Sequence, residues 1–181
     1  MKTTNSNTRS IVLAGLILFA AFSRLIPHLP NFTPLISIAL FGGAYFSNKK
    51  WAFAVPLLAM ILSDVLLSIT QNYALFDNMR IVVYGSFLLI TCIGFLLSKR
   101  TSLSNITVAS LSGSVLFFII TNLAVWYGNA LYTQNIAGLT ECYAVGIPFF
   151  SNMLISTLIY STALFGGFEF AKYKFPVLAN K

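Results

Sequence analysis

Six apolar runs, most of them long enough to cross a lipid bilayer as a helix, dominate the 181-residue sequence. A helical span needs roughly 17 to 25 such residues. The runs cover about residues 10–26, 34–47, 51–70, 80–97, 104–126 and 148–171. The second run is the shortest, which suggests a tilted or partly re-entrant helix. We therefore predict an all-α integral membrane protein, a single domain over residues 1–181 with six transmembrane helices.

The composition excludes a water-soluble domain. Hydrophobic residues make up 57% of the chain and charged residues 8%, whereas soluble domains carry about 25% charged residues. The net charge of +7 is divided among short clusters between the apolar runs, so we expect no nucleic-acid partner. The first run also resembles a signal peptide, but cleavage would remove a span, and we expect an uncleaved helix.

The basic residues follow the order of the spans. Arg24 and Arg80 lie on one side of a six-span arrangement, and the other nine of the eleven basic residues lie on the opposite side. These nine are Lys2, Arg9, Lys49, Lys50, Lys99, Arg100, Lys172, Lys174 and Lys181. Lys and Arg are enriched in cytoplasmic loops. We therefore predict that both termini are cytoplasmic, in the bacterial inner (cytoplasmic) membrane.

The longest predicted connection runs from Tyr127 to Ile147, on the predicted outer side. Its 21 residues exceed the usual length of a connection between bundled helices, and long loops are often functional. We predict that it folds over the outer opening as a lid.

Polar residues gather near the predicted outer ends of the spans. Asp64 is the one acidic residue well inside a span, about 20 Å along its helix from Trp51 at ~1.5 Å per residue. Polar groups are costly in a bilayer, so each is a candidate for a site. We predict a substrate-binding cavity that opens outward, with these residues as candidates: Arg24, His28, Asp64, Arg80, Tyr84, Asn122, Trp126 and Asn152.

A structural role explains the same residues without a ligand. Asp64 could pair with Arg24 or Arg80 to hold the bundle together, and Asn122 and Asn152 could join helices by hydrogen bonds. Trp126 suits an interfacial aromatic belt. Both interpretations remain open at the level of the sequence.

Motifs of enzymes and cofactor sites are missing from the sequence. His28 is the one histidine, so neither a histidine-dependent intramembrane protease nor a zinc site has its residues. No phosphate-binding Gly-rich motif occurs either. We expect no catalytic residue, no metal and no cofactor.

Five segments resemble a known class of membrane proteins. They are RLIPHLPNFTP (24–34), ALFGGAYF (39–46), LSD (62–64), TNLAVW (121–126) and GIPFFSNML (146–154). They resemble a bacterial membrane family that is similar in size and topology to the substrate-binding S components of energy-coupling-factor (ECF) vitamin transporters. The nearest characterised relatives would be the BtuM-type cobalamin transporters. The resemblance implies an S-component-like bundle in which His28, Asp64 and Tyr84 face the substrate.

The chain departs from that class in two places. S components often carry an Ala-x-x-x-Ala step in the first helix, whereas here Ala14 is followed four residues later by Leu18. BtuM-type proteins hold cobalt with a cysteine, and residues 65–83 contain none. Docking to a coupling subunit and binding of a corrinoid are therefore the weaker implications.

The leading hypothesis is a small-molecule uptake protein of the S-component type. Its partners would be a small organic solute, vitamin-like or a corrinoid, the lipid bilayer and an ECF-type energising module. The alternative is a structural or assembly protein of the membrane with no transported substrate.

Overall fold

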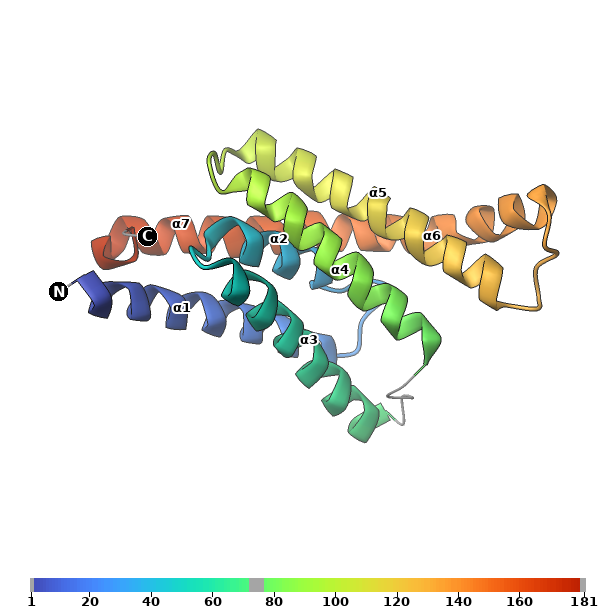
Figure 1. The fold of residues 1–181 in the computed structure, drawn as a ribbon, viewed down its shortest axis with the longest axis horizontal. Helices are drawn as coiled ribbons and strands as arrows, with labels where there is room; N and C mark the ends of the chain where they lie inside the picture. Colours follow the sequence, from blue (N-terminus) through green and yellow to red (C-terminus); the bar gives the residue numbers. More distant parts are fainter. Residues whose placement is uncertain (1, 72–76, 180–181) are drawn as a thin grey trace.

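The structure, a computed structural model, describes residues 2–71 and 77–179, with side chains from residue 7 onward. The described residues form helices and connections without a strand (Figure 1). The α-helices are α1 (Lys2–Phe22), α2 (Leu35–Tyr45), α3 (Lys49–Gln71), α4 (Asn78–Leu97), α5 (Leu103–Gly128), α6 (Ile136–Ser161) and α7 (Gly167–Lys174). Short 3-10 turns, η1 (Ser23–Leu25) and η3 (Pro176–Leu178), follow α1 and α7, and a π-helical segment, η2 (Thr162–Gly166), joins α6 to α7. The predicted all-α class is confirmed.

Within the described residues, five helical stretches are long and apolar enough to cross a membrane. They are Asn7–Leu25, Lys49–Gln71, Asn78–Leu97, Leu103–Gly128 and Ile136–Lys174. The second predicted span, 34–47, contains only α2, whose 11 residues extend over about 16 Å at 1.5 Å per residue. The hydrocarbon core of a bilayer is about 30 Å thick. The chain is thus a membrane protein, and its described part contains five helices of spanning length and one short apolar helix.

Helix α2 is the centre of the bundle, and each of its 11 residues is buried. A helix that is apolar on all sides lies either in a protein core or in a membrane, and α2 is surrounded by other helices of the bundle. The closest neighbour is α4, because Gly43 and Gly94 let the two backbones meet: a Cβ on Gly43 would lie 2.3 Å from the carbonyl oxygen of Thr91. Gly42 likewise leaves room for a neighbour, here the ring of Pro56 in α3. Small residues thus set the packing of α2, as they commonly do between membrane helices.

Four aromatic rings fill the space between α2 and the last part of the chain. Phe41 packs edge-on against Phe165 and Phe168, with ring centroids 5.4 and 5.7 Å apart. Tyr45 packs on Phe168 at 4.6 Å. Phe165 lies in the π-helical segment and Phe168 in α7. These contacts fix the C-terminal helices to the core of the bundle.

The long connection predicted at residues 127–147 is mostly helical. Residues 136–147 form the first half of α6, which begins at its N-cap Asn135, whose side chain accepts a hydrogen bond from the Gly138 amide. Pro148 lies inside this helix rather than at its start. Membrane helices tolerate an internal proline because neighbouring groups satisfy the freed carbonyl. The predicted 21-residue lid was therefore wrong, and only residues 129–135 connect α5 to α6.

The two ends of the chain lie at the same end of the molecule (Figure 1), which we call the terminal end. The Arg9 guanidinium of α1 donates to the carbonyl of Leu178, 3.3 Å away. The side chains of Lys2 and Lys181, and most of the predicted connection 71–79, lie outside the described residues. The basic residues whose side chains are described at this end include Arg9, Lys49 and Lys172.

Candidate functional site

Asp64 lies between two arginines, towards the end of the molecule away from the termini. One carboxylate oxygen is 2.7 Å from Nη2 of Arg24, and the other is 2.8 Å from Nη1 of Arg80. The Tyr84 hydroxyl donates to the second oxygen at 2.9 Å. Arg24 also donates to the hydroxyl of Ser63 at 2.5 Å. We call these five residues the Asp64 cluster.

The Asp64 cluster joins three parts of the fold. Arg24 comes from the turn after α1, Ser63 and Asp64 from α3, and Arg80 and Tyr84 from the first turns of α4. The side chains of Arg24, Asp64 and Arg80 are 11%, 5% and 13% exposed. Ion pairs buried to this degree interact strongly, but they also lose hydration. The sequence suggested one arginine as the partner of Asp64, and the structure brings both to it.

The charges of the Asp64 cluster do not balance. Within its five residues, two guanidinium groups meet one carboxylate, so the formal charge of the cluster itself is +1. The Nε of Arg24 is buried and has no hydrogen-bond partner among the described residues. An excess charge and an unused donor favour an anionic group, because charge-assisted hydrogen bonds to arginine are among the stronger ones in proteins.

His28 and Asn152 lie around the proline-rich connection between α1 and α2. His28 is exposed, and its Nδ1 lies 2.7 Å from the carbonyl oxygen of Ile26. The Asn152 amide donates to the carbonyl of Pro30 at 3.1 Å, and the Ser156 hydroxyl donates to that of Thr33 at the same distance. These bonds hold the connection on α6. Asn152 therefore joins α6 to the irregular connection rather than to a second helix.

Asn122 and Trp126 belong to α5 and contact α6 and the connection that follows α5. The Asn122 amide donates to Phe118 one turn earlier. Its Oδ1 lies so close to Gly146 that a Cβ there would be 2.5 Å away. The indole of Trp126 donates to the carbonyl of Thr133 at 3.0 Å. No hydrogen bond or ion pair described for residues 2–71 and 77–179 joins either residue to the Asp64 cluster.

A second polar group at the terminal end was not among the predicted site residues. The Tyr45 hydroxyl donates to Glu169 at 2.5 Å, and the Lys172 ammonium lies 2.8 Å from the same carboxylate. Arg9 is 4% exposed and donates to the backbone carbonyls of Tyr45, Leu178 and Ala179. The sequence contains a sign that Arg9 is buried, because Arg9 lies one helical turn before the apolar Leu13 in a run with no acidic residue.

Two pockets open at the terminal end, and none of the predicted site residues lines either of them. The first, of about 200 Å³, lies between α1 and the α2–α3 connection and includes Arg9 and Asn48. The second, of about 210 Å³, lies between α5 and the end of α6 and includes Ser110 and Ser161. Among the described residues, no group of three or more His, Cys, Asp or Glu side chains is placed to hold a metal ion.

Comparison with known proteins places the chain in a sequence family. A family model described as "Family of unknown function (DUF6580)" matches residues 4–178. Neither the curated proteins nor the solved structures contain a match.

Proposed function

Because this chain belongs to the family of unknown function DUF6580, whose description names no ligand, we propose a function from the chain's own residues. The protein binds a small organic solute that carries an anionic group and takes part in its uptake across the membrane. The site is the Asp64 cluster, which in this proposal opens outward. The solute is vitamin-like, and an ECF-type energising module is the proposed partner.

The topology of this proposal has six crossings, with both termini in the cytoplasm of a bacterium. Two observations favour it. Nine of the eleven basic residues fall on one side of such an arrangement, as the positive-inside rule requires. The N- and C-termini also lie at one end of the bundle (Figure 1), which an even number of crossings produces. Helix α2 is then a short crossing, buried among longer helices.

The observation that carries the proposal is the excess positive charge of the Asp64 cluster. If the cluster only held helices together, one arginine would give a more stable fold than two. Each charge that is not balanced away from water raises the free energy of the folded state. An anionic solute would balance the net positive charge of the cluster. Carboxylates and phosphates match the planar array of arginine donors, so a solute with one of these groups fits best.

A structural role is the second candidate, and one observation favours it. Both oxygens of Asp64 are already bonded, to Arg24 on one side and to Arg80 and Tyr84 on the other. The cluster therefore joins α1, α3 and α4 without any ligand. In this alternative the protein is a structural or assembly component of the membrane with no transported substrate.

Thermal unfolding with a panel of solutes separates the two candidates. The panel contains biotin, pantothenate and nicotinate as carboxylates, thiamine as a cationic control, and cobalamin as a test of the corrinoid implication. A ligand that binds only the native state raises its stability. We expect a carboxylate to raise the unfolding temperature of the wild type, and mass spectrometry of the purified protein to detect a bound solute.

The variant Arg80→Gln provides the sharper comparison. It leaves the Arg24–Asp64 pair intact with balanced charge, so the fold should persist. In the uptake proposal, this variant loses the stabilisation by the anionic solute. If no solute stabilises the wild type and Arg80→Gln only changes its stability, the structural role is favoured and the uptake proposal fails.

A further inference from the structure

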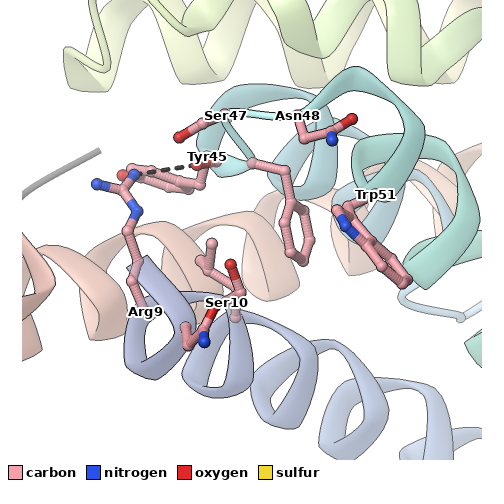
Figure 2. Close-up of a pocket in the computed structure, with 9 residues that line it drawn as sticks. Arg9, Ser10, Tyr45, Ser47, Asn48 and Trp51 are labelled. Carbon is pink, nitrogen blue, oxygen red and sulfur yellow. Dashed lines mark hydrogen bonds between the residues drawn. The ribbon is translucent and has the colours of Figure 1, made fainter. Parts of the chain in front are cut away.

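The first pocket at the terminal end has the composition of an anion site (Figure 2). It lies where the first half of α1 faces the connection between α2 and α3, and its polar lining includes Arg9, Ser10, Ser47 and Asn48, with Trp51 at its edge. Its volume of about 200 Å³ is several times the ~30 Å³ that a water molecule occupies in the liquid. A tetrahedral oxyanion therefore fits inside it.

Arg9 supplies a buried positive charge to this pocket. The side chain is 4% exposed, and its hydrogen-bond partners are the neutral carbonyls of Tyr45, Leu178 and Ala179. None of the ion pairs between described side chains includes Arg9, and its Nε has no partner within that part of the chain. The nearby carboxylate of Glu169 is engaged by Tyr45 and Lys172. A buried guanidinium without a bonded anion is a costly arrangement.

The start of α3 adds positive potential on the other side of the pocket. The helix begins at Lys49 and has no acidic residue in its first turn. A helix N-terminus carries a partial positive charge, which normally favours Asp or Glu there. Lys49 and Lys50 place two further positive charges at this end. Beside the pocket, the Asn48 side chain caps the helix by accepting from the Lys50 amide at 2.8 Å.

We propose that this pocket binds a phosphate group, either from an anionic lipid headgroup or from a soluble phosphate. Arg9 provides the buried charge, and the hydroxyls of Ser10 and Ser47 provide donors at the rim. Arg9 attracts the phosphate through its charge, because both of its Nη groups already donate to backbone carbonyls. Trp51 is 56% exposed, and exposed tryptophans at a membrane interface favour the headgroup region. This site is separate from the Asp64 cluster and does not depend on the proposed uptake function.

The test measures thermal unfolding of the full-length protein in a neutral detergent. The probes are inorganic phosphate at constant ionic strength and phosphatidylglycerol in mixed micelles, with phosphatidylcholine as the zwitterionic control. Native mass spectrometry counts the phosphatidylglycerol molecules that the protein retains. We expect a rise in the unfolding temperature with at least one anionic probe, because a ligand specific for the folded state stabilises it.

Substitutions that place a charge at the exposed residue Ser47 provide the decisive test. Ser47→Glu places a negative charge at the rim and should weaken binding on the order of tenfold or more, given the size of charge interactions near a protein surface. Ser47→Lys should strengthen binding instead. Ser104→Glu is the matched control, since it introduces the same charge at an exposed position outside the pocket.

Three results support the site and identify its ligand. If both anionic probes stabilise the wild type and Ser47→Glu abolishes both effects, the pocket recognises phosphate from either source. An effect of phosphatidylglycerol alone identifies a lipid headgroup, and an effect of inorganic phosphate alone identifies a soluble phosphate. Equal shifts in the wild type, both Ser47 variants and Ser104→Glu, or no shift with any probe, would overturn the proposal.

Discussion

The arrangement around Asp64 follows from the cost of charge in an apolar environment. The sequence predicts the partners of Asp64 because few charges share its side of the bundle, and a buried carboxylate needs a partner. It does not predict that both arginines bind one acid, since that depends on how α1, α3 and α4 meet. The partners of Asn152 and Asn122 were also beyond prediction. Asn152 bonds to an irregular connection, and Asn122 bonds within its own helix.

Removing the charge of Asp64 should destabilise the protein strongly. The variant Asp64→Asn keeps the shape of the side chain but leaves Arg24 and Arg80 facing each other without an anion. We expect a loss of about 3–5 kcal/mol in the free energy of unfolding, as is typical when one partner of a buried ion pair is removed. The double variant with Arg24→Gln should recover part of the loss, because it removes one stranded charge. Equal stability of Asp64→Asn and the wild type would contradict the ion pairs described here.

Removing the hydroxyl of Tyr84 should lower the free energy of unfolding by less than removing the charge of Asp64. Tyr84→Phe removes the hydrogen bond to Asp64 and leaves both ion pairs in place. Hydrogen bonds to charged groups contribute about 1.5–3 kcal/mol, so we expect a loss in that range in chemical unfolding experiments. Tyr160→Phe is a suitable control, since its hydroxyl bonds to Ser23 and not to the cluster. A Tyr84→Phe loss no larger than about 0.5 kcal/mol would show that the bond is not formed.

At the scale of elements, the apolar runs of the sequence predict where most helices lie. The prolines are a poorer guide to where the helices begin. The helices α3, α4 and α5 lie within a few residues of the predicted spans 51–70, 80–97 and 104–126. The predicted sixth span begins at Pro148, about a dozen residues after the first residue of α6, Ile136, because a proline inside a membrane helix looks in the sequence like a helix start. The complete burial of α2 could not be deduced, because runs that face lipid and runs that face protein are equally apolar.

Two glycines of α4 provide a test of its contact with α2. A Cβ on Gly94 would lie 2.6 Å from the carbonyl oxygen of Leu40, whereas a Cβ on Gly85 has nothing within 4 Å. We expect Gly94→Ala to destabilise the fold by about 1–3 kcal/mol through overpacking. Gly85→Ala should be neutral or stabilising by up to about 1 kcal/mol, because alanine favours helix. Thermal unfolding of the two variants checks this, and equal effects would argue against close α2–α4 packing.

At the scale of the whole molecule, the proposed topology puts the α2–α3 and α5–α6 connections on opposite sides of the membrane. A single cysteine at Asn48 should be protected from an impermeant thiol reagent in intact cells, and one at Asn135 should be labelled. Both positions are exposed, and the two native cysteines would first be replaced by alanine. Labelling at Asn48 without labelling at Asn135 would reverse the orientation. Labelling of both from outside would exclude six crossings.

The contact between Arg9 and the far end of the chain has a consequence for synthesis. The carbonyl of Leu178 that Arg9 binds lies 169 residues later in the sequence, and chains emerge from the ribosome N-terminus first. The first helix therefore enters the membrane with an arginine whose final partners do not yet exist. Until the last turn arrives, the guanidinium can bond only to the carbonyl of Tyr45 and to water or lipid headgroups. A chain that stopped before Pro176 would leave Arg9 with the carbonyl of Tyr45 alone among the three carbonyls to which it donates in the complete fold.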